Sequence, residues 1–175
     1  MIIENIDLDE DGQPKYYVDG IPKKIVLEIP ILPVKFGLQK VGKNYIIKCA
    51  LTGIAKGIAQ DAIKEFYLKI GTIEQRIKEL AIANQVKNVK FKPTFYQNRG
   101  FDPLIKLKVN YRYNKVESIF KDEINTELTM TEFGRKLNKA HVTGEISLNY
   151  LYSIDSNNDV IMGIIWTIKE LKLVN

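Results

Sequence analysis

The chain has 175 residues, of which 45% are hydrophobic and 27% charged, and its formal net charge is +5. These values fit one ordinary globular domain with a sizeable core. One cysteine, Cys49, excludes an internal disulfide, and one histidine, His141, leaves too few ligands for a Cys/His zinc site. With no signal-peptide pattern and no apolar run near the ~18 residues of a membrane span, we expect a soluble, intracellular protein.

The first 22 residues are predicted to be a polar, acidic lead-in to a single domain over residues 23–175. Two turn sequences, DGQP and DGIP, interrupt this lead-in. Its motif DLDEDG (residues 7–12) matches the first half of an EF-hand calcium loop. However, Val18 stands where that loop needs a bidentate glutamate, so we expect an acidic turn.

Alternating apolar and polar residues predict strands on both sides of one helix. The expected strands are 23–29, 33–41, 44–51, 88–95, 103–113, 115–120, 124–130, 141–154 and 160–174. The period changes over residues 55–84, where one apolar stripe recurs every three or four residues: Ile63, Phe66, Ile70, Ile73, Ile77 and Leu80. This stripe could form a coiled-coil seam, but packing across a sheet is the preferred interpretation. Residues 131–140 are either a helical turn or a basic loop, and the whole predicts a small, mostly antiparallel barrel.

The stretch DPLIKLKVNYRY (residues 102–113) alternates along its length. One parity holds Ile105, Leu107, Val109, Tyr111 and Tyr113, and the other holds Lys106, Lys108, Asn110 and Arg112. Since successive side chains of a strand point to opposite faces, the first set is predicted to be core and the second set a basic outer face. In the penultimate strand, one face is predicted to hold Val142, Gly144, Ile146, Leu148, Tyr150 and Tyr152.

Basic and aromatic residues are concentrated together over residues 87–115. This segment holds eight basic residues against a single acidic one, Asp102. Proteins that bind single-stranded nucleic acid combine cations that track the phosphates with rings on which unpaired bases stack. The alternative is a solvated strand face whose lysines deter edge pairing. Composition alone weighs the two interpretations evenly.

No catalytic arrangement stands out, so we expect neither an enzyme nor a metal or cofactor site. One His and one Cys leave almost no room for a nucleophile with its base, and GIAKGIAQ lacks the GK[ST] of a phosphate-binding loop. Metal-dependent phosphoryl chemistry would need converging carboxylates, and no spacing brings the candidates together. These candidates are Glu28, Asp61, Glu65 and Asp102.

The second half of the chain resembles the single-stranded DNA-binding proteins of large DNA viruses and phages, in the OB-fold group related to the podophage replication protein. The resemblance covers residues 88–174 and rests on FKPTFYQNRGFDPLIKLKV and on a closing hairpin with Gly163, Trp166 and Lys169. It implies an OB-like barrel that coats displaced single strands during viral replication and recombination. The chain departs from the family pattern after the last strand, where KELKLVN stands in place of a long acidic tail that recruits replication proteins.

Together, the composition and the resemblance predict a site without sequence preference. The candidate residues are Lys90, Lys92, Phe95, Tyr96, Arg99, Lys106, Lys108, Arg112, Lys115, Trp166 and Lys169. Trp166 has two interpretations, core residue or stacking platform, whereas Tyr96 is the better candidate for stacking. The predicted partner is single-stranded DNA, as the resemblance implies. RNA stays open as an alternative, because phosphate tracking and ring stacking do not read the 2′-hydroxyl.

A second hypothesis is a virion or assembly protein whose β-domain makes protein contacts and whose helix mediates self-association. A metal-dependent nuclease is the third. As a single-stranded DNA-binding protein, the chain would act in the host cytoplasm or at a viral replication site.

Overall fold

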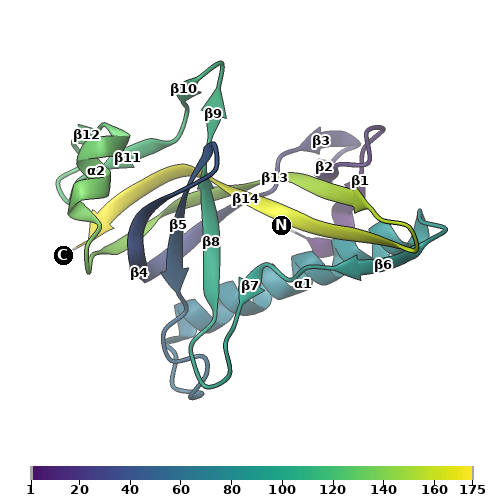
Figure 1. The fold of residues 1–175 in the computed structure, drawn as a ribbon, viewed down its shortest axis with the longest axis horizontal. Helices are drawn as coiled ribbons and strands as arrows, with labels where there is room; N and C mark the ends of the chain where they lie inside the picture. Colours follow the sequence, from purple (N-terminus) through teal and green to yellow (C-terminus); the bar gives the residue numbers. More distant parts are fainter. Residues whose placement is uncertain (1, 175) are drawn as a thin grey trace.

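A closed barrel of five strands forms the centre of the computed structural model, which describes residues 2–174. The barrel strands, in order of pairing, are β4 (Val26–Val41), β5 (Asn44–Ala50), β8 (Leu104–Val109), β14 (Asp159–Val174) and β13 (His141–Asp155), which returns to β4 (Figure 1). The predicted OB-like, mainly β fold is confirmed. The pairing around the barrel is antiparallel except at the seam between β8 and β14, which is parallel, in agreement with the mostly antiparallel barrel that was predicted.

The strand β4 is long enough to stagger the barrel. Its residues 26–33 pair with β13, and its residues 34–41 pair with β5. Strands that close into a barrel must tilt and shift in register, and this offset supplies the shift. The two strands predicted over 23–29 and 33–41 therefore merge into one strand that begins at Val26, whereas Lys23 belongs to β3 (Ile21–Lys23).

The helix α1 (Asp61–Ala83) closes one side of the barrel, below it in Figure 1. The predicted stripe is its buried face, except that Ala81 is buried and Leu80 is only partly buried. The stripe packs against this chain's own strands, as the preferred interpretation expects. Of the two helices among residues 2–174, neither combines the length and the apolar character that a helix needs to cross a membrane.

Residues 6–23 form a small sheet where only a polar lead-in was expected. After the 3-10 turn η1 (Ile3–Asn5), the strands β1 (Ile6–Leu8), β2 (Pro14–Val18) and β3 (Ile21–Lys23) pair in order. Ile6 is fully buried, and its carbonyl accepts a hydrogen bond from Arg76 Nε at 3.2 Å. The side-chain amide of Gln13 both donates to and accepts from the backbone of Leu151, which ties the sheet to β13.

The acidic motif of this sheet is the expected turn. The carboxylate of Asp9 accepts hydrogen bonds from the backbone N–H groups of Asp11 and Gln13. Lys15 lies 3.5 Å from the same carboxylate. The Gln13 hydrogen bond is the main reason that the pKa of Asp9 is lowered. The carboxylate of Asp9, the second aspartate of the motif, is thus occupied by its own loop and by Lys15.

Six short elements complete the fold outside the barrel. They are β6 (Asn88–Phe91), β7 (Phe95–Tyr96), β9 (Tyr111–Arg112), β10 (Lys115–Val116), β11 (Ile119–Lys121) and β12 (Glu127–Leu128). The strand predicted over 103–113 stops at Asn110, whose backbone N–H donates to Ser118 Oγ at 2.8 Å and so leaves the ladder. Of the strand predicted over 124–130, only the two residues of β12 are extended.

A second helix, α2 (Met130–Lys136), confirms the helical alternative for residues 131–140. It begins at a capping box in which Thr129 and Glu132 satisfy each other's backbone N–H groups. The hydroxyl and backbone of Thr129 lower the pKa of Glu132. The sequence T-M-T-E carries this signal, so the helix start was open to prediction.

Candidate nucleic-acid interface

The strand β8 has the two faces that its alternation predicts. Ile105, Leu107 and Val109 are fully buried. Lys106 and Lys108 point to the other side, where Lys106 is exposed and Lys108 half-buried. The alternation does not extend past the strand: Tyr113, predicted to be core, is 87% exposed at the tip of the next hairpin.

A row of three lysines crosses the outer face of the barrel. Lys35 on β4 pairs with Lys48 on β5, and Lys48 pairs with Lys106 on β8. Neighbouring strands lie about 4.7–4.9 Å apart, so the three stems stand side by side. Like charges directly opposite each other destabilise a sheet. Among residues 2–174 no carboxylate lies within ion-pair distance of these lysines, so the row favours an anionic ligand.

The acidic residue nearest in sequence does not neutralise this row. Asp102 accepts hydrogen bonds from the backbone N–H groups of Gly53 and Ala55, both at 3.0 Å. Its carboxylate therefore holds the loop that precedes α1. The single acid of the basic segment has a structural partner of its own.

A groove of about 660 Å³ runs beside the lysines. Its basic and aromatic lining residues are Lys48, Lys92, Lys106, Lys108, Phe95, Tyr96, Tyr150, Tyr152 and Trp166. Asp and Glu are absent from the lining, as far as the described part of the chain goes. Tyr96 is 64% exposed, whereas Phe95 packs on Tyr67 of α1 with ring centroids 4.8 Å apart. The groove thus combines cations with an accessible ring.

A β-bulge brings two unpredicted tyrosines into the groove. Leu148 pairs with Trp166 but Tyr150 pairs with Ile165, so Asn149 is an extra residue in β13. One extra residue reverses the facing of the side chains that follow it. The prediction that Tyr150 and Tyr152 share a face with Leu148 is therefore wrong. The ammonium of Lys108 lies 5.8 Å from the Tyr150 ring centroid.

Gly163 provides the space in which Tyr152 lies. A Cβ atom built on Gly163 would lie 2.5 Å from the Tyr152 hydroxyl and 2.7 Å from its Cζ. We expect Gly163→Ala to displace this ring, to lower the free energy of unfolding by about 1–3 kcal/mol as overpacking does, and to weaken oligonucleotide binding. Urea unfolding and fluorescence titration measure the two effects. An unchanged affinity would show that Tyr152 does not contact the oligonucleotide.

A second bulge exposes Phe36 beside the lysine row. The register between β4 and β5 shifts between Lys35 and Leu38, and Phe36 and Gly37 both have positive φ there. Phe36 is 72% exposed, and Lys48 Nζ lies 5.8 Å from its ring centroid. The prediction from sequence missed this residue. A glycine inside a strand pattern is a known sign of a bulge and was the available signal.

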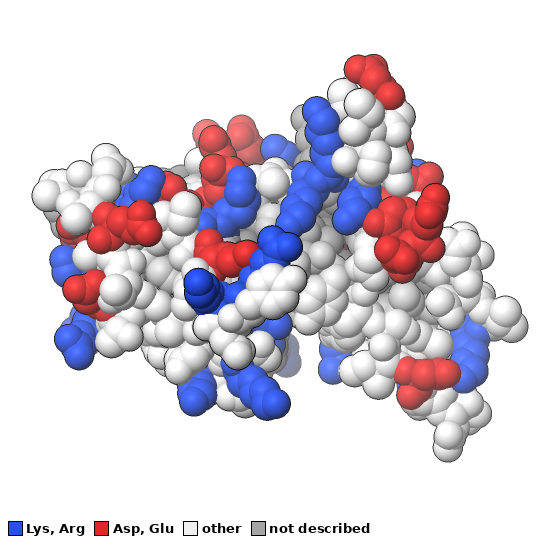
Figure 2. Space-filling view, turned by 90° about the horizontal axis from the view of Figure 1, so that it is seen from above, with Lys and Arg blue, Asp and Glu red and all other residues white. Residues whose placement is uncertain are grey.

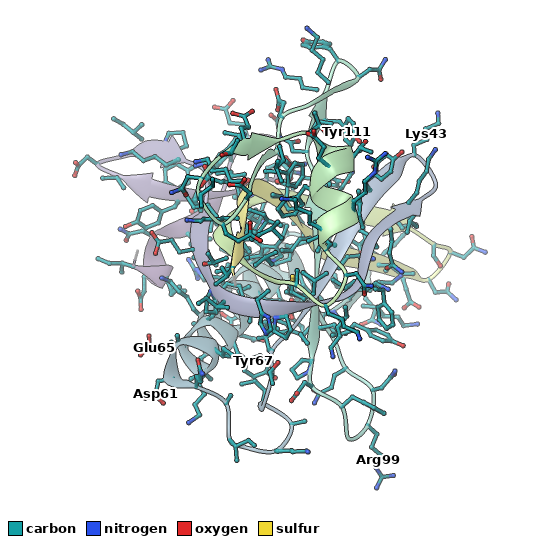
Figure 3. All side chains as sticks on the ribbon, turned by 90° about the vertical axis from the view of Figure 1, so that its left-hand side faces the viewer. Lys43, Asp61, Glu65, Tyr67, Arg99 and Tyr111 are labelled. Atoms are coloured by element: carbon teal, nitrogen blue, oxygen red, sulfur yellow. The ribbon has the colours of Figure 1, made fainter. Side chains whose placement is uncertain are left out.

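The predicted site residues lie in several separate places. Lys92, Phe95, Tyr96, Lys106 and Lys108 line the groove. Arg99 lies in the loop between β7 and β8 and points away from the barrel (Figure 3). In that view it lies at the opposite end of the molecule from Lys43 of the β4–β5 turn. Arg112 and Lys115 belong to the β9–β10 hairpin.

Lys90 and Lys169 have acidic partners instead. Lys90 forms an ion pair with Asp159, which is the main cause of the lowered pKa of that carboxyl group. Lys169 lies 3.3 Å from Glu145. Neither lysine lines the groove, so both contribute less to an anion site than their sequence positions indicate.

Trp166 lies in the core, as the first of its two interpretations states. It is 1% exposed, and its register partners Leu107 and Leu148 are buried with it. A ring without an accessible face offers no platform for a base. Trp166 lies beneath the groove and is one of its lining residues. We do not count it among the residues that contact a ligand, because its ring is not accessible.

The like-charge pair across β5 and β8 predicts that one substitution will raise the stability of the fold and weaken nucleic-acid binding. Replacing Lys106 by glutamate turns the Lys48–Lys106 contact into an attractive one, so we expect the free energy of unfolding to rise by about 0.2–1 kcal/mol. The same change removes a cation from the groove and should weaken nucleic-acid binding. Chemical denaturation and an oligonucleotide titration measure the two effects. A variant that is less stable than the unchanged protein and binds the oligonucleotide with the same affinity would contradict this account of the row.

The surface charge is unevenly distributed. In the view from above, Lys and Arg side chains gather over the middle of the molecule (Figure 2). The largest acidic clusters lie on the right of that view, the side on which Figure 1 places β1 and β2. Acidic side chains lie among these cations in the same view, so the case for an anionic ligand rests on the lining of the groove, which holds no Asp or Glu among the described residues.

Solved structures of two phage proteins share this architecture. The single-stranded DNA-binding protein from bacteriophage Enc34 matches with a TM-score of 0.56 and 9% identity, over 96% of this chain and 88% of that one. The single-stranded DNA-binding protein gp2.5 encoded by bacteriophage T7 matches with a TM-score of 0.55 and 9% identity, over 87% of each chain. The chain has the fold of phage single-stranded DNA-binding proteins.

The Enc34 protein solved in complex with single-stranded DNA matches over 98% of this chain and 96% of that one, with a TM-score of 0.52 and 10% identity. No protein-family model and no curated protein matches the sequence. The likeness therefore lies in the arrangement of the strands and the helix, since about nine in ten aligned residues differ.

Proposed function

We propose that this chain binds single-stranded DNA without sequence preference, in replication or recombination of viral DNA. The observation that carries the proposal is the lysine row Lys35–Lys48–Lys106 beside a groove that is lined by aromatic rings, with Tyr96 exposed, and that lacks described carboxylates. Cations in a row neutralise successive phosphates and release counterions, while the rings hold unstacked bases. In OB-fold barrels, the face of the second and third strands, here β5 and β8, is the one that binds oligonucleotides.

Direct chemistry on the nucleic acid is not part of the proposal. Among residues 2–174, no three His, Cys, Asp or Glu side chains gather where they could hold a metal ion. The free thiol of Cys49 is buried, and burial raises its pKa to about 12, so it is not a nucleophile at neutral pH. Both solved neighbours are named for binding and not for catalysis.

The test is a titration of fluorescent oligo-dT beside a duplex of equal length, at several salt concentrations. If about five phosphates are neutralised, the logarithm of the affinity should fall with the logarithm of salt at a slope of roughly −3.5. The single strand should bind more tightly than the duplex, and added magnesium should leave it intact. A protein that binds neither, or that prefers the duplex, would favour the assembly-protein hypothesis; cleavage would favour a nuclease.

A further inference from the structure

We infer that the β9–β10 hairpin is a second contact site for the same single strand, which extends the path beyond the groove. This inference rests on the proposed function and concerns a segment outside the five barrel strands. The hairpin projects from the end of β8 (Figure 1). Arg112 pairs with Lys115, so Tyr113 and Asn114 alone form its turn.

Tyr113 occupies a position that its backbone conformation disfavours. Tyr113 and Asn114 have φ values of 49° and 62°. A two-residue turn of this kind requires positive φ at both positions and is usually made by Asn-Gly or Asp-Gly. A tyrosine there is strained, and its ring is 87% exposed, so it does not compensate through burial. Its ring contact is the guanidinium of Arg112, whose Cζ lies 5.5 Å from the ring centroid.

The base of the hairpin is fixed by packing. Tyr111 lies against Tyr45 with ring centroids 6.1 Å apart, and its hydroxyl donates to Met130 Sδ of α2 at 3.2 Å (Figure 3). Burial raises the pKa of this hydroxyl, so it stays protonated as a donor. The exposed tip is therefore presented from an anchored base.

A second hollow joins the groove to this hairpin. It measures about 550 Å³ and lies between the β4–β5 turn and the hairpin base. Lys40, Lys43 and Asn114 line it, and it shares Asn44 and Lys108 with the groove. Its described lining holds no Asp or Glu. A strand leaving the groove at Lys108 thus meets further cations on its way to Tyr113.

The charges on the hairpin agree with an anionic ligand. Arg112 lies 3.9 Å from Glu117, at the outer limit of an ion pair, and Glu117 also accepts a hydrogen bond from Asn110. Lys115 has no carboxylate within ion-pair distance among the described residues. An arginine, an exposed ring and a free lysine are the groups that hold an unpaired nucleotide.

The experiment compares Tyr113→Gly with the unchanged protein on two oligo-dT lengths. OB folds occupy about 4–16 nucleotides, so one probe has about 4 nucleotides and the other about 16. Glycine suits the positive φ, which keeps the variant folded; thermal unfolding checks this. We expect the affinity for the long probe to fall about 5-fold or more, as loss of one stacked base does, and the affinity for the short probe to stay the same.

Three other outcomes would contradict the inference or the proposed function. Equal affinities on both probes for variant and unchanged protein would overturn the inference and leave the proposed function standing. A loss on both probes would place Tyr113 within the central site, and this also contradicts an extended path. If the unchanged protein bound neither probe, the proposed function itself would fail. Tyr113→Phe keeps the ring and should behave as the unchanged protein does.

Discussion

Replacing Lys106 and Lys108 together by glutamate is expected to weaken single-stranded DNA binding about 25-fold at 0.1 M salt. Each phosphate contact on a single strand contributes about 0.7 to the slope of log affinity against log salt. Losing two contacts should therefore change a slope of roughly −3.5 to about −2. All sequences should be affected alike, because phosphates carry no base information.

The matched control is Lys69→Glu with Lys78→Glu, which makes the same change in net charge on α1. Neither lysine lines the groove. This control should retain nearly the full affinity and slope, apart from a small effect of net charge. If both double variants lost binding equally, the effect would reflect the overall charge, and the lysines of β8 would have no special place in the mechanism.

Replacing Trp166 by alanine is expected to lower the free energy of unfolding by about 3–5 kcal/mol, the usual cost of emptying a large aromatic site in a core. Trp166→Phe should cost less, since it leaves a smaller cavity. The indole N–H has no hydrogen-bond partner in the described structure, so its removal breaks no bond. Urea unfolding followed by circular dichroism measures both variants.

Binding discriminates between the two interpretations of this residue. At a temperature where Trp166→Phe is folded, its affinity for oligo-dT should equal that of the unchanged protein, because the ring at this position is buried. A stacking platform would behave in the opposite way. It would show little loss of stability and a loss of affinity in the alanine variant.

The sequence best predicts which residues face the core where its apolar pattern has the period of the strand or helix that forms. The alternation over Ile105–Val109 and the stripe from Ile63 to Ile77 both specify a face, and burial of that face against the core fixes the orientation. Composition also located the basic segment, because charged side chains are excluded from the core and must lie on the surface. The fold class and one wall of the groove follow from these signals.

The remainder depends on single residues that break a period. One extra residue at Asn149 turns Tyr150 and Tyr152 toward the groove, and a bulge at Phe36 exposes its ring. The row Lys35–Lys48–Lys106 depends on register between strands far apart in sequence. No local pattern contains that register, so two of its three lysines were missed.

The most direct test of the central claim is photo-crosslinking of a bromouridine-substituted oligo-dT, followed by mass spectrometry of the attached peptides. The account predicts adducts on the rings that border the lysine row and groove: Phe36, Tyr96, Tyr150 and Tyr152. Adducts confined to α1 or to the β1–β3 sheet, with these four rings unmodified, would contradict it.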